Sequence, residues 1–145
     1  MSVLFVCLGN ICRSPTAEAV FRELCPEVAT DSAGTGGWHV GAPPYGPMQH
    51  AARARGYEMA DLRARQFRPS DFDDFELIIG MDAQNIADIE DLRPVGAQTP
   101  VKSLALFGEL GHQHVPDPYY TRDFNEALDI VEDAVRGLVR SLRNS

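Results

Sequence analysis

Two kinds of hydrophobic pattern alternate along the chain. Short apolar runs rich in β-branched and aromatic residues are typical of buried strands. Between them lie longer segments whose apolar positions recur every three or four residues, as in a helix that packs one face on a core. The runs predict strands at residues 2–6, 27 to about 32, 75–81 and 99–104. The helices are expected at residues 14–24 and 48–56, directly after Asp82, and at about 122–142.

Residues typical of helix ends mark several of these boundaries. Ser14 is the expected N-cap of the first helix, with Pro15 at the first helical position, where its missing N–H costs nothing. Gly56 would close the second helix, and Asp82 would cap the third. The final helix shows the clearest apolar face, made of Phe124, Ala127, Leu128, Val131, Ala134, Val135, Leu138 and Leu142.

Strands that alternate with helices imply right-handed crossovers and a parallel sheet covered on both faces. We therefore predict one α/β domain over residues 1–145, with a four-stranded parallel sheet and helices on both sides. In such a sheet, binding sites lie beyond the carboxyl ends of the strands, where the chain changes its direction of winding. The loop "CLGNICRS", residues 7–14, follows the first strand at such an end.

Composition narrows the function classes. The chain carries 13 Lys and Arg against 21 Asp and Glu, a formal net charge of −8, which argues against nucleic acid as a partner. No stretch approaches the roughly 20 apolar residues that cross a bilayer, so no membrane association is expected. The first residues, "MSVLFVCLGN", resemble no secretory leader, and we expect a cytoplasmic protein.

The chain contains three cysteines, Cys7, Cys12 and Cys25. An odd number without an export signal argues against a disulfide framework, and Cys25 is expected to be a packing residue. A zinc site would need a short Cys-x2-Cys or paired-histidine spacing, which the chain lacks, so no metal and no other cofactor are expected.

The loop after the first strand has the composition of an anion site. Successive backbone N–H groups followed by a helix N-terminus form a concave, positively polarised nest. Gly9 and Asn10 are expected to supply positive φ angles for the turn, and Arg13 offers a two-pronged donor for a tetrahedral anion. Such a nest favours the thiolate form of Cys7 at its base, which would suit attack on phosphorus.

Phosphoryl transfer to a thiolate also needs a proton donor for the leaving oxygen. Asp117 is the candidate, because Pro116 and Pro118 stiffen the backbone around its carboxyl group in "VPDPYYT". The alternative is a turn residue that stabilises the start of the last helix. The acidic run Asp71, Asp73, Asp74 and Glu76 is expected to be a solvated face.

The motif Cys-x5-Arg-Ser together with a late "DPYY" resembles the low-molecular-weight protein tyrosine phosphatases. The similarity extends over the whole chain and includes "DSAGT", "WHVG", "ARQF" and the "MD" at Met81 and Asp82. It implies hydrolysis of phosphotyrosine in a protein or peptide, release of inorganic phosphate, no cofactor, and a monomer or a weakly self-associating protein. It also implies a sheet of four parallel strands, in agreement with the pattern above.

The resemblance also implies roles for single residues. Cys7 would be the nucleophile, Arg13 the phosphate clamp and Asp117 the general acid and then base. The phosphate loop would comprise Leu8, Gly9, Asn10, Ile11, Cys12, Arg13 and Ser14, with Asn10, Ser14 and Ser32 as its support. Leu8, Ile11, Trp38, Tyr119 and Tyr120 would form the walls around the substrate ring. Cys12 would form a reversible disulfide with Cys7, although a small buried side chain is the competing interpretation.

Two departures from the family pattern concern the surroundings of the site. Many members have Asp-Pro-Arg where this chain has "PPYGP" at Pro43 to Pro47, in the loop from Gly34 to Pro47 that is expected to set specificity. Several members have a histidine before "ARQ", where this region reads "DLRARQ".

Three alternatives remain on the same scaffold. Related arginine phosphatases carry threonine where this chain has Ile11, and related arsenate reductases use further cysteines that the segment Met81 to Leu106 lacks. A phosphopeptide-binding module without turnover would have no use for both a nucleophile and an aimed acid.

Overall fold

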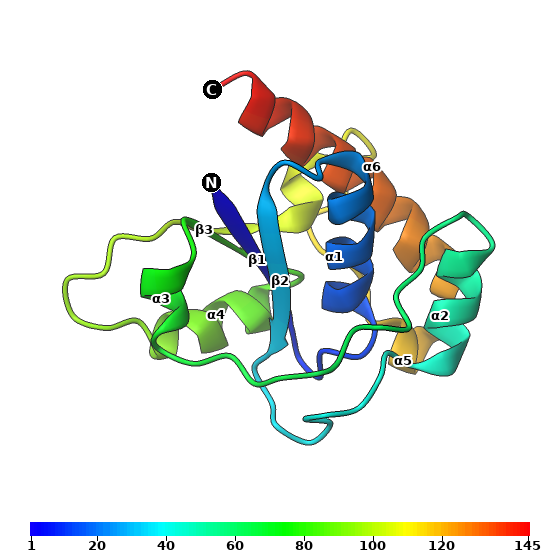
Figure 1. The fold of residues 1–145 in the computed structure, drawn as a ribbon, viewed down its shortest axis with the longest axis horizontal. Helices are drawn as coiled ribbons and strands as arrows, with labels where there is room; N and C mark the ends of the chain where they lie inside the picture. Colours follow the sequence, from blue (N-terminus) through cyan, green and yellow to red (C-terminus); the bar gives the residue numbers. More distant parts are fainter.

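Four parallel strands form the centre of the computed structural model, which describes residues 1–145 (Figure 1). The sheet has the order β2-β1-β3-β4. Val6 of β1 pairs with Ala33 of β2 on one side and with Gly80 of β3 on the other. The strands are β1 (Ser2–Cys7), β2 (Ala29–Gly34), β3 (Leu77–Gly80) and β4 (Val101–Ser103).

Helices cover both faces of this sheet. In Figure 1, α1 (Arg13–Leu24) and α6 (Phe124–Arg143) lie on one side, and α3 (Asp71–Asp74) and α4 (Ala83–Asp91) lie on the other. Alternate residues of β1 belong to two separate cores. Val3 and Phe5 pack in the core that includes α1 and α6, whereas Leu4 and Val6 pack in the core that includes α3 and α4. Because both faces are buried, β1 is apolar at every position from Val3 to Cys7 rather than at every second one.

Three shorter helices connect this framework. They are α2 (Gly46–Arg53), the 3-10 helix η1 (Leu104–Phe107) and α5 (Pro118–Thr121). Gly137 of α6 lies directly against η1, since a Cβ atom there would come within 1.8 Å of the Phe107 carbonyl oxygen. Glycine is therefore needed for this close contact between the two elements.

The predicted α/β class, the four parallel strands and the four predicted helices are confirmed, although the second helix ends at Arg53, before the expected closing residue Gly56. Asp82 caps α4 as expected, because its side chain accepts a hydrogen bond from the Asn85 N–H. The expected cap of α1 is wrong: the helix begins at Arg13, so Ser14 and Pro15 are its second and third residues. The Ser14 hydroxyl is instead used inside the loop that precedes the helix.

The acidic run is not one solvated face. Asp73 and Asp74 are exposed, but Asp71 is fully buried, and its two carboxylate oxygens each accept a hydrogen bond of 3.1 Å from the Arg65 guanidinium. An ion pair with a residue outside the run makes this burial tolerable. The run therefore combines surface residues with a structural one.

The winding of the chain reverses at β1, which lies between β2 and β3. The phosphate loop leaves the carboxyl end of β1 and leads into α1, at the end of the sheet far from both termini (Figure 1). This position agrees with the rule for sites in open parallel sheets. None of the helices combines the length and the apolar character that a membrane crossing requires.

Candidate active site

The turn of the phosphate loop depends on one residue with a left-handed backbone. Asn10 has φ of 56°, as expected, whereas Gly9 has no positive φ, contrary to the prediction. Glycine at position 9 is explained by a close approach instead, because a Cβ atom there would lie 3.1 Å from Cδ2 of His39. Glycine is thus favoured at position 9 by the close approach of His39 and not by a positive φ angle.

Three carbonyl groups of the phosphate loop accept hydrogen bonds from the chain around it. Thr35 N–H donates to the Cys7 carbonyl, Gly36 N–H to that of Leu8, and Tyr45 N–H to that of Ile11. The N–H groups of Leu8, Gly9, Ile11 and Cys12 donate to no acceptor within the chain. These four donors can therefore serve an oxyanion in the concave side of the loop.

Cys7 lies at the base of this loop with only 3% of its surface exposed. Its sulfur is 3.0 Å from the Ser14 hydroxyl oxygen and accepts a hydrogen bond of 3.2 Å from the Asn10 backbone N–H. The Asn10 N–H donates to this sulfur and the Ser14 hydroxyl is placed to do the same, an arrangement that stabilises the thiolate, the nucleophilic form.

The Asn10 side chain organises the residues beneath the loop. Its Nδ2 donates to Ser14 Oγ over 2.7 Å and to Ser32 Oγ over 3.0 Å. Its Oδ1 accepts a hydrogen bond of 3.0 Å from the Arg65 backbone N–H. Asn10 and its three partners are all partly or fully buried. The side-chain amide therefore has one orientation in which both its oxygen and its nitrogen are hydrogen-bonded.

Arg13 is 3% exposed and has three partners at the opposite side of the loop. Its Nη1 donates to Asp82 Oδ2 over 2.6 Å and to the Val115 carbonyl over 3.1 Å, and its Nη2 donates to Asp117 Oδ2 over 3.3 Å. Burial favours the neutral guanidine, but the negative charges of Cys7, Asp82 and Asp117 outweigh it and raise the pKa of Arg13. The side chain stays a cation.

Asp117 comes from the other end of the chain, 104 residues after Arg13. It is the N-cap of α5, and its Oδ1 accepts a hydrogen bond of 3.1 Å from the Tyr119 N–H. The other carboxylate oxygen is the one that faces Arg13. The cap therefore holds the carboxyl group over the phosphate loop, so the turn role and a catalytic role are compatible.

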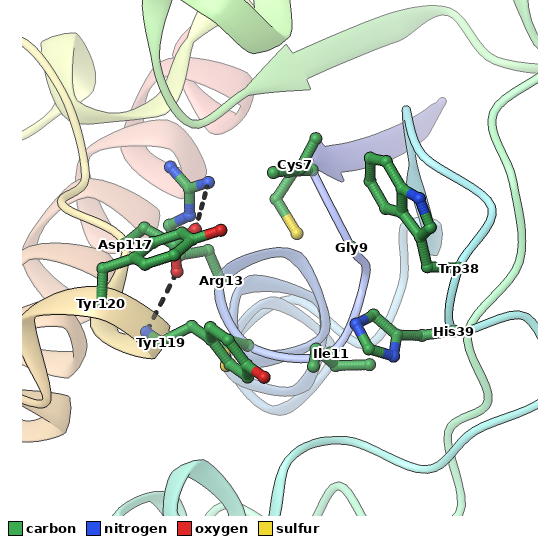
Figure 2. A pocket seen from close by; sticks show the side chains of 11 residues that line it. Cys7, Gly9, Ile11, Arg13, Trp38, His39, Asp117, Tyr119 and Tyr120 are labelled. Atoms are coloured by element: carbon green, nitrogen blue, oxygen red, sulfur yellow. Dashed lines mark hydrogen bonds and ion pairs between the residues drawn. The ribbon is translucent and has the colours of Figure 1, made fainter.

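A pocket of about 220 Å³ joins these groups. Figure 2 shows Trp38 and His39 on one side of Cys7, and Tyr119, Tyr120 and Asp117 on the other. Trp38 and Tyr120 are each 73% exposed, so the aromatic side chains form the mouth and the thiol lies at the base. The lining consists of Cys7, Leu8, Gly9, Ile11, Cys12, Arg13, Trp38, His39, Asp117, Tyr119 and Tyr120.

A sequence model of the family described as low molecular weight phosphotyrosine protein phosphatase matches residues 2–145. The chain belongs to this family. It is 41% identical to the low molecular weight protein-tyrosine-phosphatase YfkJ of Bacillus subtilis, over 99% of this chain and 96% of that one. It is 42% identical to a putative low molecular weight protein-tyrosine-phosphatase of Synechocystis, over 98% and 96% of the two chains.

Solved structures agree with this assignment. The crystal structure of Bacillus subtilis YfkJ matches with a TM-score of 0.93, covering 99% of this chain and 95% of that one, at 41% identity. A protein tyrosine phosphatase of Entamoeba histolytica, crystallised with Hepes in its active site, matches with a TM-score of 0.92 at 37% identity, covering 99% and 97%. The protein is thus an enzyme, a low-molecular-weight protein tyrosine phosphatase.

Cys12 of this phosphatase lines the pocket beside Cys7 but has a different environment. Burial raises the pKa of Cys12 to about 12, and the negative charges of Cys7 and Asp117 add to the effect. It is therefore a neutral thiol at physiological pH. All three cysteines are free.

Three functional contacts of the phosphatase were not predicted from sequence. Asp82 was interpreted only as a helix cap, yet it also binds Arg13. His39 follows Trp38 and lines the same pocket. Glu18 is buried and contacts Ser32 beneath the loop. The "MD" and "WHVG" motifs contain the first two residues, whereas nothing local distinguishes Glu18 from a surface residue of a helix.

No group of three or more His, Cys, Asp and Glu side chains has the arrangement of a metal site. The polar side-chain groups that line the pocket are instead two thiols, a guanidinium, an imidazole, a carboxylate, two phenol hydroxyls and an indole N–H. Their chemistry suits an anion and a proton transfer.

Proposed function

We propose that this phosphatase hydrolyses phosphotyrosine in proteins or peptides through a cysteinyl-phosphate intermediate. The observation that carries the proposal is one pocket that contains an arginine, an aimed carboxyl group and a thiol that is hydrogen-bonded to the Asn10 N–H and the Ser14 hydroxyl. Cys7, Arg13 and Asp117 are its catalytic residues.

In the first step, the Cys7 sulfur attacks phosphorus, and the bond between phosphorus and the tyrosine oxygen breaks. Asp117 transfers its proton to that oxygen, so the tyrosine leaves as a neutral phenol. In the second step, water attacks the phosphorus of cysteinyl-phosphate, and Asp117 takes a proton from this water. The sulfur–phosphorus bond breaks, and inorganic phosphate and the thiolate are released.

Arg13 and the loop amides stabilise the charge on the transferred group. Asp82 and the Val115 carbonyl anchor Nη1 of Arg13, which fixes the plane of the guanidinium. Nη2 faces Asp117 in this structure and can exchange that contact for a phosphate oxygen. The exchange would release the Asp117 carboxyl group toward the leaving oxygen, while the free loop N–H groups bind the remaining oxygens.

The preference for an aromatic phosphate follows from the depth of the nucleophile. Cys7 is nearly inaccessible at the base, whereas Trp38, Tyr119 and Tyr120 stand at the mouth and Ile11 lies between. A phosphate on a planar ring can reach the thiol while the ring contacts these walls. A phosphate on the short serine side chain would bring the peptide backbone against the same walls.

Turnover of the Cys7→Ser and Asp117→Ala variants tests this mechanism. With EDTA present, Cys7→Ser should abolish hydrolysis of p-nitrophenyl phosphate and of a phosphotyrosine peptide. Asp117→Ala should lower peptide hydrolysis by on the order of 10²- to 10⁴-fold, and less for p-nitrophenyl phosphate, whose leaving group needs little protonation.

Asp91→Ala, which removes an exposed carboxylate at the end of α4, is the matched control and should hydrolyse both substrates normally. Unchanged peptide hydrolysis by Asp117→Ala would contradict the assignment of the acid. A panel of phosphotyrosine, phosphoserine and phosphoarginine peptides tests the substrate class, and preferential hydrolysis of phosphoarginine would replace the proposal by an arginine phosphatase.

A further inference from the structure

Glu18 is a buried carboxyl group that the mechanism above does not use. It lies on α1 four residues after Ser14, and only 7% of its surface is exposed. It forms no ion pair. Its one hydrogen-bond partner is Ser32 of β2, whose hydroxyl donates to Glu18 Oε1 over 2.6 Å.

This contact is the end of a continuous hydrogen-bonded chain that leads to the nucleophile. Ser32 Oγ accepts from Asn10 Nδ2 over 3.0 Å, and the same Nδ2 donates to Ser14 Oγ over 2.7 Å. Ser14 Oγ is 3.0 Å from the Cys7 sulfur. The five residues from Glu18 to Cys7 are all buried, so little water competes for these bonds.

The donors and acceptors of the chain have a defined direction. The Arg65 backbone N–H occupies Asn10 Oδ1, so Asn10 Nδ2 must donate both of its protons. Ser32 accepts one of them and must direct its own proton elsewhere, and Glu18 is the acceptor. Ser14 accepts the other, which leaves its proton for the Cys7 sulfur or for the Ala33 carbonyl at 3.4 Å.

The charged groups that face Glu18 already have partners of their own. Asp31 of β2 is paired with Arg65, and Arg22 of α1 is paired with Asp61 in the segment after α2. Burial raises the pKa of Glu18 to about 7, and the hydrogen bond from Ser32 opposes this shift. Asp31 and Asp61 raise the pKa further, whereas Arg22 lowers it. The carboxyl group therefore changes its charge near neutral pH.

We propose that Glu18 is a positioning residue for the nucleophile, and that loss of its proton increases the reactivity of the Cys7 thiolate through Ser32, Asn10 and Ser14. The inference rests on the proposed function, in which Cys7 attacks phosphorus. Two physical effects of the Glu18 carboxylate both raise the basicity of the Cys7 sulfur. The carboxylate draws the Ser32 proton and strengthens the bond from Asn10 to Ser32, which weakens the competing bond from Asn10 to Ser14. Its negative charge also opposes the thiolate directly in a medium of low dielectric constant.

The rate of Cys7 alkylation by iodoacetamide between pH 5 and 9 tests the inference, with mass spectrometry of the Cys7 peptide as the readout. The wild type should show an additional rise of about two-fold centred near pH 7, since a thiolate of higher basicity reacts faster. Glu18→Gln keeps the shape and an acceptor oxygen for Ser32 but cannot ionise, and it should lack this rise. Glu23→Gln removes an exposed carboxylate from the same helix and should retain it.

Superimposable curves for the wild type and Glu18→Gln would overturn the proposal. A purely structural role would lower stability in Glu18→Gln without changing the shape of the pH profile. Should Glu18→Gln fail to fold, the wild type itself decides: the ¹⁵N and ¹H shifts of the Asn10 side-chain amide should titrate between pH 6 and 8. Constant shifts there would refute the coupling.

Failure of the proposed function would be visible separately. Alkylation and amide shifts do not depend on turnover, so the Glu18 result stands whether or not Cys7→Ser loses its phosphatase activity. The converse outcome is loss of turnover in Cys7→Ser together with a wild-type alkylation rate that shows no additional rise near pH 7. That result would support the mechanism and refute only the role of Glu18.

Discussion

Cys7 and Cys12 lie in the same loop, but their surroundings give them different chemistry. The Cys7 sulfur is hydrogen-bonded to the Asn10 N–H at 3.2 Å and to the Ser14 hydroxyl at 3.0 Å. Cys12 has a pKa raised to about 12 by burial and by the charges of Cys7 and Asp117, so it does not compete with Cys7 for attack on phosphorus. Its position in the same pocket supports our proposal that it acts on an oxidised Cys7.

Mild peroxide treatment tests this role of Cys12. Peroxide converts the Cys7 thiolate to a sulfenic acid, and the Cys12 thiol then attacks that sulfur, forming a disulfide and releasing water. Dithiothreitol should restore turnover in the wild type and in Cys25→Ser. In Cys12→Ser, Cys7 should proceed to sulfinic acid and remain inactive. Peptide mapping that finds sulfinic acid at Cys7 of the wild type, with no link to Cys12, would contradict the role.

At the scale of elements, the site is assembled from segments held against the phosphate loop. The segment from Gly34 to Pro47 is bonded to this loop through Gly36 and Tyr45, and it supplies Trp38 and His39 to the pocket mouth. A Cβ atom at Gly34 would lie 2.8 Å from the Leu8 carbonyl oxygen, so the end of β2 touches the loop. A substitution at the exposed Trp38 can therefore change the rim without moving Cys7, whereas a side chain at Gly34 would press on the loop.

The segment before α3 supports the loop from beneath, and Asp71 anchors it. Asp71 accepts two bonds from the Arg65 side chain and one of 2.9 Å from the Arg68 N–H. Asp71→Ala should lower the free energy of unfolding by about 3 kcal/mol, because it leaves part of a buried ion pair without its partner. The measurement is urea denaturation.

Asp73→Ala provides the comparison within the same short helix. Asp73 is exposed and forms no ion pair, so its removal should change the free energy of unfolding by about 0.5 kcal/mol or less. Equal stability of the two variants would show that the buried pair contributes nothing to the fold.

For the molecule as a whole, the pocket is a site of positive potential on a chain with a negative net charge. The chain has a formal net charge of −8, yet Arg13 and the free loop amides concentrate positive potential at the base of one pocket. The acidic surface disfavours anions elsewhere. An oxyanion should therefore bind at this place and stabilise the entire domain by mass action.

Thermal unfolding with vanadate measures this stabilisation. At about 100 times its Kd, vanadate should add about 2.7 kcal/mol, which corresponds to an increase in Tm of about 5 to 10 °C for a domain of this size.

Arg13→Lys should reduce the increase strongly, since lysine lacks the two-pronged donor, whereas Arg63→Lys at the surface should retain it. The same increase in both variants would argue that vanadate binds outside the pocket.

Much of this architecture could be predicted because the decisive forces act between neighbours in sequence. The apolar runs predicted all four strands, and the motif from Cys7 to Ser14 contained the loop, its left-handed residue Asn10 and the anchor Arg13. Backbone torsions, caps and hydrophobic periodicity depend on a few consecutive residues. Asp117 was singled out by the two prolines beside it, and it lies in the same pocket as Cys7, with its carboxylate against Arg13.

Only the tertiary structure decided which charged groups are buried and what they contact. The sequence by itself determined the alternation of strands and helices, but Asp71, Glu18 and Asp82 look like ordinary helix residues in it. Their partners Arg65, Ser32 and Arg13 are distant along the chain or on another element. The energy of a polar group in a protein is set by burial and by the donors around it, and both arise only when the elements have packed.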